Sequence, residues 1–208
     1  MSSQNANGTA RLPQGTRGRQ KVALLLDTAA AVFAEQGFDA ATMTEIAARA
    51  GASIGSLYQY FPTKEQVADA LLQRFAEQLY QRMEALVEAA ANWSAAELLE
   101  RLYPALIQFR SDNPAFIILA EARSGPALAA MQIRARMRTY VQAILRQQAP
   151  ERDEAELELL AVLVLQVMKT AAGLYAEPDL PQREQVLSEL KTMLQDCLER
   201  RLYQRAGR

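Results

Sequence analysis

The stretch TMTEIAARAGASIGSLYQYFPTKE, residues 42–65, carries the signals that decide the fold. It opens with the pattern of a capping box, in which a threonine hydroxyl and a glutamate carboxylate each bind a free backbone amide at a helix start. Gly51 is expected to end this helix after about two turns. Ser53 is placed to cap another helix, which Pro62 cannot continue. The stretch therefore predicts two short helices joined by a glycine turn, residues 42–61.

Apolar and polar residues occupy different faces of these two helices. The residues expected to point inward are Ile46, Ala47, Ala50, Leu57 and Phe61. The second helix then exposes hydroxyl and amide groups with little bulk near its start: Ser53, Ile54, Gly55, Ser56, Tyr58, Gln59 and Tyr60. In the major groove of DNA, glutamine pairs with adenine, serine donates or accepts, and an apolar side chain contacts the thymine methyl. The arrangement predicts a helix-turn-helix that binds double-stranded DNA.

The rest of the chain repeats the same helical signals. Periodic apolar positions, capping residues and Gly or Pro stops recur without strand alternation, so the predicted fold class is all-α, with about nine helices. One helix precedes the quoted stretch and stops at Gly37. That helix spans residues 19–36, and the helices expected after the two short ones span residues 63–92, 94–111, 112–123, 126–148, 153–176 and 181–205. Residues 1–16 are polar and contain almost no large apolar side chains, which predicts a disordered arm.

The composition restricts the classes of function. The 208 residues are 50% hydrophobic, and 23 basic side chains nearly balance 24 acidic ones. Histidine is absent, which removes the commonest zinc ligand and the usual general base of hydrolases. The carboxylates show no paired arrangement, and there is no phosphate-binding glycine loop. The chain is therefore predicted not to be an enzyme and to hold no metal or cofactor.

The distribution of apolar residues and cysteine predicts the compartment. No apolar run is expected to reach the roughly 20 residues that cross a bilayer, and the amino terminus is polar. The single cysteine, Cys197, allows no intrachain disulfide and fits a reducing environment. We therefore expect a soluble cytoplasmic protein with no membrane partner.

The longer segment AAAVFAEQGFDAATMTEIAARAGASIGSLYQYFPTKEQV resembles the DNA-binding domain of the TetR family. The pair Gly37-Phe38 precedes a threonine-capped helix, and the motif G-S-L-Y-x-Y-F-x-x-K-E runs from Gly55 to Glu65. The similarity covers residues 19–70, and beyond it only the number, length and order of helices match. The resemblance implies a dimeric transcriptional repressor, released from operator DNA by a small apolar or aromatic inducer. Residues 17–65 would form the helix-turn-helix domain, and residues 66–208 the ligand-binding and dimerisation bundle.

The resemblance also implies which residues contact DNA. Base or backbone contacts would come from Ser53, Ile54, Gly55, Ser56, Tyr58 and Gln59. Tyr60 and Lys64 would hold phosphates, a role that the helix start at Lys64 also favours, and Thr42 and Thr44 would lie near the DNA backbone. The family often has lysine in place of Ile54 and arginine or histidine near Gln59. A smaller salt dependence is therefore expected, unless basic residues near the amino terminus replace this charge: Arg11, Arg17, Arg19 and Lys21.

Large apolar residues recur at helical spacing in the bundle, where core packing alone would account for them. The family encloses an inducer in this region, and methionine and aromatic side chains suit an adaptable apolar pocket. The candidate pocket residues on this resemblance are Trp93, Phe109, Phe116, Tyr140 and Met168.

The last two helices are apolar nearly all round, so each is expected to be buried on more than one side. The family forms a symmetric four-helix dimer interface from them. The candidate interface residues are Leu160, Leu163, Val167, Leu187, Leu190 and Leu194. Two alternatives remain open. One is a monomer with these helices in its own core, and the other is a helical scaffold protein whose two short helices bind a protein partner.

Overall fold

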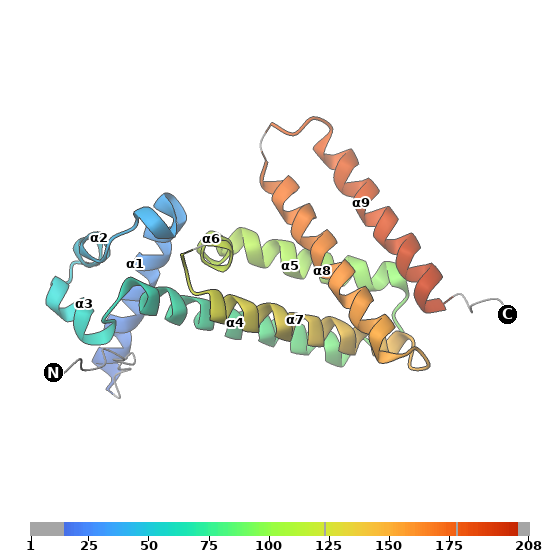
Figure 1. Ribbon diagram of the computed structural model, residues 1–208, viewed down its shortest axis with the longest axis horizontal. Helices are drawn as coiled ribbons and strands as arrows, with labels where there is room; N and C mark the ends of the chain where they lie inside the picture. The colour runs from blue at the N-terminus through green and yellow to red at the C-terminus, as the bar shows by residue number, and fades with distance from the viewer. Residues whose placement is uncertain (1–14, 123, 178, 204–208) are drawn as a thin grey trace, which may run out of the picture. The chain divides into compact units, whose positions relative to one another are not determined.

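The structure, a computed structural model, describes residues 15–122, 124–177 and 179–203, and these contain helices and no strand. Within these ranges (Figure 1) the α-helices are α1 Thr16–Ala40, α2 Met43–Arg49, α3 Ile54–Tyr60, α4 Lys64–Ala89, α5 Ala95–Asp112, α6 Pro114–Glu121, α7 Ala127–Gln148, α8 Glu154–Ala176 and α9 Arg183–Leu198. A π-helical turn, η1 Glu199–Tyr203, follows. The all-α prediction is confirmed. Residues 1–14 of the predicted arm, with Arg11, lie outside the described residues.

Side-chain caps explain why the helices begin where they do. At four helix starts a side-chain oxygen accepts a hydrogen bond from the backbone amide three residues later. These bonds join Thr42 to Glu45 (3.2 Å), Ser53 to Ser56 (3.3 Å), Thr63 to Gln66 (3.3 Å) and Asp153 to Glu156 (2.8 Å). At Ser94 both halves of a capping box form, because the Ser94 amide also donates to the Glu97 carboxylate (2.9 Å). Each cap satisfies an amide that has no partner within its helix.

Two glycines with left-handed backbone conformation set the turns around α2 and α3. Gly37 has a φ of 81° and interrupts α1, so residues 38–40 form a separate last turn. The stop predicted at this glycine is therefore a kink followed by a short continuation. Gly51, with a φ of 61°, makes the turn between α2 and α3. Side chains with a Cβ disfavour both conformations.

The chain forms two compact units. The first contains the residues up to Ala76 together with Asn113–Met131, and so combines the helix-turn-helix with α6. Within it α6 packs on α1, and the rings of Phe75 and Phe116 meet edge to face with centroids 6.2 Å apart. A segment expected in the ligand-binding bundle thus packs beside the DNA-binding helices. The boundary between residues 65 and 66 stays a prediction.

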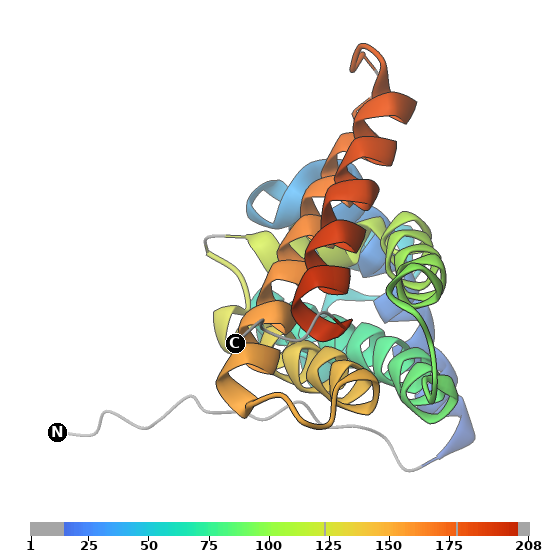
Figure 2. The same ribbon diagram turned by 90° about the vertical axis from the view of Figure 1, so that its right-hand side faces the viewer.

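The second unit comprises Glu77–Asp112 and the residues from Gln132 onward. Its helices α8 and α9 lie side by side as an antiparallel pair, and both contact α5 (Figures 1 and 2). The buried residues in the described part of the chain are all apolar, and three methionines of this unit, Met83, Met137 and Met168, are among them. The core of this unit is therefore apolar and includes flexible, polarisable side chains.

One stretch of α8 corrects an expectation. Glu154–Leu174 has the length and mean hydropathy, 1.7, of a membrane-spanning segment, although no such run was expected. Scattered charges such as Glu158 and Lys169 interrupt the run in the sequence without lowering its average below that of a span. The core helix of a soluble protein has the same composition, and α8 packs against α5 and α9.

Candidate DNA-binding site

The residues of α3 that were predicted to point outward are exposed or half-buried, and their contact with DNA stays a prediction. Ser53, Gly55 and Gln59 are exposed, and Ser56 and Tyr60 are half-buried. The side chains of Ile54 and Tyr58 are 39% and 48% exposed, respectively. Residues 54–60 include no charged side chain, so the exposed surface of α3 is polar but uncharged. Thr42 and Thr44 at the start of α2 are exposed as well.

The opposite faces of α2 and α3 anchor this surface. Ile46, Ala47, Leu57 and Phe61 are each at most 2% exposed, which confirms that they point inward, and Ala50 is half-buried. The two helices pack against each other, and α2 packs on α1. Since the buried residues cannot shift without opening the core, the polar groups of α3 are held in a fixed orientation.

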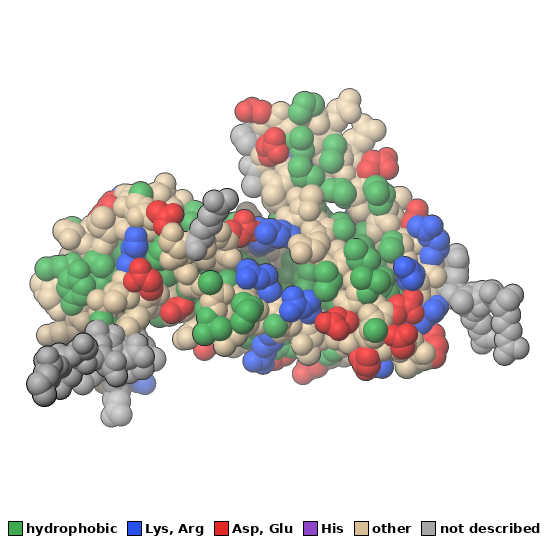
Figure 3. Space-filling view, viewed as in Figure 1, with side chains coloured by type: hydrophobic (Ala, Val, Ile, Leu, Met, Phe, Trp, Pro, Cys, Tyr) green, Lys and Arg blue, Asp and Glu red, His purple; other side chains and the backbone are tan. Residues whose placement is uncertain are grey.

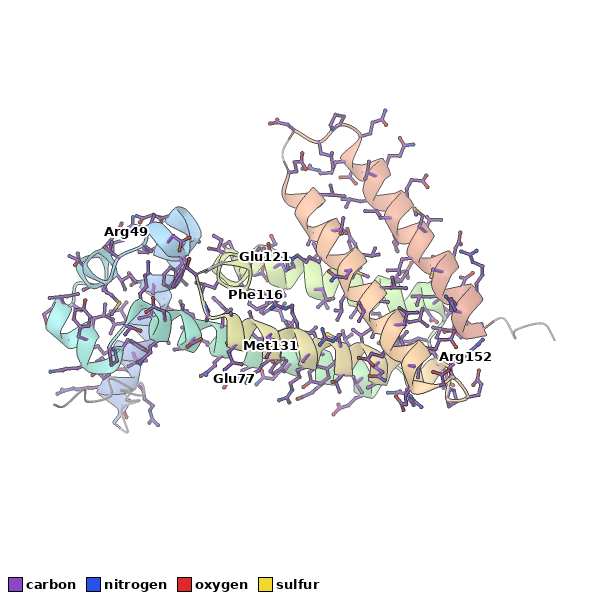
Figure 4. All side chains as sticks on the ribbon, in the orientation of Figure 1. Arg49, Glu77, Phe116, Glu121, Met131 and Arg152 are labelled. Atoms are coloured by element: carbon purple, nitrogen blue, oxygen red, sulfur yellow. The ribbon has the colours of Figure 1, made fainter. Side chains whose placement is uncertain are left out.

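An ion-pair network holds α2 against α1. Arg49 of α2, labelled in Figure 4, pairs with Glu35 of α1 (2.5 Å) and with Glu45 of its own helix (2.8 Å), and Gln36 donates to Glu45 (2.6 Å). The hydrogen bond to Glu35 raises the pKa of Arg49 above its ordinary value. The Glu45–Arg49 pair has the four-residue spacing that a sequence reveals. Glu35 becomes a partner only through the packing of α1 on α2, and the sequence pattern missed it.

Lys64, the first residue of α4, has partners other than the expected phosphate. Its Nζ donates to the backbone carbonyl oxygens of Phe38 (2.7 Å), Asp39 (3.0 Å) and Ala41 (2.9 Å). It also lies 4.6 Å from the centre of the Phe38 ring. An ammonium group has three N–H donors, so these carbonyls occupy all of them. To hold a phosphate, Lys64 would have to give up these bonds, and this geometry speaks against the predicted contact.

Basic residues do gather at the start of α1. Arg17, Arg19 and Lys21 are all exposed there. They are the residues predicted to replace the missing charge of α3, and their side chains are available to solvent. Whether they contact DNA stays a prediction.

The predicted pocket residues have separate surroundings. Phe116, labelled in Figure 4, packs on Phe75 in the first unit, while the other four belong to the second. Phe109 and Met168 are buried there. Trp93 lies in the turn between α4 and α5, where its carbonyl oxygen accepts a hydrogen bond from the Tyr203 hydroxyl (2.9 Å). Phe116 therefore packs in a different unit from the remaining candidates.

Tyr140 lies in a polar network between α4 and α7. Its hydroxyl donates to Glu84 (2.6 Å) and accepts from Arg136 (3.3 Å). The Arg136 guanidinium lies 4.5 Å from the centre of the Tyr80 ring and 5.6 Å from that of Tyr140. Burial and the hydrogen bond to Glu84 raise the pKa of Tyr140. This charged and partly exposed setting argues against Tyr140 lining an enclosed apolar pocket.

The six predicted interface residues differ in how far they are exposed. Leu160 and Leu194 are 1% and 5% exposed, so they pack inside their own chain and leave little surface for a partner. Leu163 is 39% exposed, and Val167, Leu187 and Leu190 are half-buried. Leu159 and Met193, not among the six, are 48% and 65% exposed. Figure 3 shows hydrophobic side chains on the surface of α8 and α9.

Two capped short helices, a glycine turn and an exposed second helix on a buried base define a helix-turn-helix protein. Family comparison agrees with this class. The chain matches "Bacterial regulatory proteins, tetR family" over residues 25–71 and "Tetracyclin repressor-like, C-terminal domain" over residues 94–198. The chain belongs to the TetR family.

Two similar proteins have names that describe regulators. The HTH-type transcriptional repressor KstR2 of Mycobacterium tuberculosis (strain ATCC 25618 / H37Rv) is 38% identical over 95 residues, 46% of each protein. The HTH-type transcriptional activator FasR of Mycolicibacterium smegmatis is 45% identical over 69 residues, 33% of this chain and 30% of FasR. The chain thus spans about half or a third of the length of these relatives.

Solved structures share the fold over most of the chain. The ketosteroid transcriptional regulator KstR2 of Mycobacterium tuberculosis has a TM-score of 0.61 at 24% identity, covering 91% of this chain and 98% of that one. The fatty acid degradation regulator FadR of Bacillus halodurans has a TM-score of 0.63 at 17% identity, covering 94% and 100%. These likenesses concern the fold alone.

Proposed function

We propose that this protein is a transcriptional repressor that reads operator DNA through α3. The observation that carries the proposal is the exposed, uncharged surface of α3, capped by Ser53 and standing on the buried Leu57 and Phe61. Ser56 and Gln59 supply hydrogen-bonding groups for base edges. Thr42, Thr44, Tyr58 and Tyr60 would add contacts to the DNA backbone, and Ile54 and Gly55 allow a close approach. Because its partner is genomic DNA, the proposed location is the cytoplasm.

The contribution of Gln59 to DNA binding can be tested by fluorescence anisotropy, with duplexes whose sequences come from the DNA flanking the protein's own gene. Gln59→Ala is expected to weaken binding by about tenfold, because one bidentate base contact contributes on the order of 1–3 kcal/mol. Gln73→Ala is the matched control, since Gln73 is an exposed glutamine of α4. A wild-type protein that binds these duplexes no better than scrambled DNA would contradict the proposal and favour a protein partner.

The apolar surface of α8 and α9 supports assembly as a homodimer. Leu159 and Leu163 are exposed one turn apart on α8, and Met193 is exposed on α9. Large apolar side chains gathered on a surface favour contact with another protein. A twofold dimer of this pair would make a four-helix interface.

We propose that the inducer is apolar. The buried residues of the described chain are all apolar and include Phe109 and Met168, so a ligand enclosed among them would meet apolar side chains. The names of the similar proteins refer to ketosteroid regulation and fatty acid degradation, both of which concern apolar compounds. A long-chain fatty acid or a steroid is expected to raise the melting temperature and to release DNA, whereas acetate is expected to do neither. Release by none of the apolar compounds would contradict this proposal.

The proposed mechanism is a shift between two populations. In one, the dimer holds its recognition helices about 34–36 Å apart, one turn of DNA. The inducer favours a second state with a wider spacing, so inducer and operator compete through coupled equilibria. We propose α4 as the connecting lever, because it supplies residues to both compact units. An unchanged separation of the recognition helices with and without inducer would count against this mechanism.

A further inference from the structure

Lys64 joins the two ends of the helix-turn-helix segment. Its three carbonyl partners belong to residues 38–41, immediately before Thr42 caps α2. Lys64 itself begins α4, after α3 has ended at Tyr60. The hydrogen bonds of Lys64 to residues 38–41 therefore link the two ends of residues 42–63, the segment that contains both α2 and α3.

The carbonyls that Lys64 binds need such a partner. Phe38 and Ala41 are 4% and 1% exposed, and the kink at Gly37 takes the last turn of α1 out of the regular helical path. Carbonyl groups at a helix end lack helical amide partners and carry partial negative charge. A cation that donates to several of them satisfies both requirements, and the adjacent Phe38 ring adds a cation–π contact.

We propose that Lys64 is a positioning residue for DNA recognition, which acts by fixing residues 38–41 and thereby the orientation of α2 and α3. This rests on the proposed function as a DNA-binding regulator. In this role the ammonium stays on the three carbonyls when DNA is bound. The role needs the shape of lysine as well as its charge, because a planar guanidinium directs its donors differently from a compact ammonium.

Two substitutions separate positioning from phosphate contact. Lys64→Met keeps the length of the side chain without its charge, and Lys64→Arg keeps the charge with a different donor geometry. We expect both to lower the ratio of affinities for own-gene and scrambled duplexes by about tenfold, since hydrogen bonds to a charged group are lost. The salt dependence of binding should stay that of the wild type, because no phosphate contact is removed.

The control is Lys169→Met, which removes an exposed ammonium from α8, outside the predicted DNA-binding residues. It is expected to leave the ratio of affinities unchanged. All binding is measured below the onset of thermal unfolding of each variant. A Lys64→Arg variant with wild-type affinity, together with a reduced salt dependence in Lys64→Met, would overturn the proposal in favour of a phosphate contact. A lower melting temperature with unchanged affinity ratios would also overturn it and leave only a structural role.

A measurement on the wild-type protein covers the case in which the variants do not fold. Reductive methylation followed by mass spectrometry compares the reactivity of Lys64 with that of the exposed Lys169 of α8. We expect Lys64 to react more slowly than Lys169, both in the free protein and with own-gene DNA. Equal reactivity in the free protein, with protection of Lys64 only by DNA, would overturn the proposal. Failure of the wild type to prefer own-gene DNA would count against the function itself, while slow methylation of free Lys64 would still show that its ammonium is engaged.

Discussion

Gly51 and Gly55 are close in sequence but have different requirements. Gly51 has a φ of 61° in the turn between α2 and α3, whereas Gly55 lies within α3. A Cβ atom built on either residue would have no neighbour within 4 Å. The backbone conformation therefore requires glycine at position 51, while at position 55 only a close approach by another molecule would do so.

Alanine at these two positions should have opposite effects on stability. Gly51→Ala is expected to lower the free energy of unfolding by about 1 kcal/mol, because alanine disfavours a positive φ. Gly55→Ala should raise it by up to roughly 1 kcal/mol through helix propensity, yet weaken DNA binding by placing a methyl group on the reading surface. Chemical denaturation and anisotropy measure the two effects. Unimpaired DNA binding by Gly55→Ala would show that DNA does not approach this residue closely.

Asp69 of α4 carries a carboxylate whose ionised form is disfavoured by its surroundings. Burial, and to a smaller extent the charge of Glu65, raises its pKa. For an acid, a folded-state pKa above the unfolded one means that ionisation disfavours folding. Its contribution therefore opposes stability at neutral pH, and this opposition disappears as the pH falls below the pKa of the unfolded carboxyl group.

Asp69→Asn is expected to stabilise the protein at neutral pH. The gain should be about 0.5 kcal/mol or less, since the like-charge pair lies on one helix and is partly exposed to solvent. The difference in melting temperature between variant and wild type should shrink as the pH is lowered below about 4, where the unfolded carboxyl is protonated. A variant that is less stable at neutral pH would show that the carboxylate has a favourable partner instead.

At the scale of elements, short helices depend on their caps. Helix α3 spans only Ile54–Tyr60, and its start is held by the Ser53 side chain, which accepts from the Ser56 amide. A helix of this length has little stability apart from its cap and the packing of its buried face. The cap residue is also exposed on the proposed DNA-reading surface.

Two substitutions at Ser53 should separate these roles. Ser53→Ala is expected to lower the free energy of unfolding by about 1 kcal/mol through loss of the cap. Ser53→Asp should keep the stability, because aspartate caps equally well, but should weaken DNA binding by placing a negative charge near phosphates. Thermal denaturation and anisotropy distinguish the effects. Tight DNA binding by Ser53→Asp would remove Ser53 from the contact surface.

Local signals predict the elements well and their partners poorly. Thr42, Ser53 and Ser94 mark helix starts within a few residues, because a cap depends on the chain immediately after it. The carbonyls that accept from Lys64 belong to residues 26, 25 and 23 positions earlier in the sequence, and only the fold brings them to the lysine. A phosphate role fitted the start of α4, but three-dimensional packing gave the ammonium other acceptors. The faces of α2 and α3 were predictable because each follows helical periodicity.

At the scale of the whole molecule, the apolar residues of α8 and α9 are of two kinds, those that pack inside their own chain and those exposed on its surface. The sequence alone does not tell the two kinds apart. Leu160 and Leu194 face the interior of their own chain, whereas Leu163 and Met193 are exposed. In a helix such as α8, with apolar residues on more than one side, periodicity does not show which side the same chain covers. The same difficulty hides the packing of α6 on α1, which separates Phe116 from the other pocket candidates.

A charge on the exposed side should dissociate the proposed dimer. The double variant Leu163→Glu and Met193→Glu is expected to sediment as a monomer at micromolar concentration, because burying unpaired carboxylates in an apolar interface is strongly unfavourable. Leu24→Glu is the control, since Leu24 is an exposed leucine of α1, 52% exposed. A wild-type protein that is already monomeric, or a double variant that remains dimeric, would exclude this interface.

The surroundings of Trp93 make it a fluorescent probe of the second unit. Trp93 is the one tryptophan of the sequence, is 8% exposed, and lies under the Arg101 guanidinium, 5.0 Å from its ring. Its carbonyl is tied to Tyr203 in the turn that follows α9. Loosening of that turn would break this hydrogen bond, and the emission of the indole would report any change in its surroundings. The protein thus carries its own fluorophore at the junction of its fourth and fifth helices, and no label is needed to follow the attachment of its last turn.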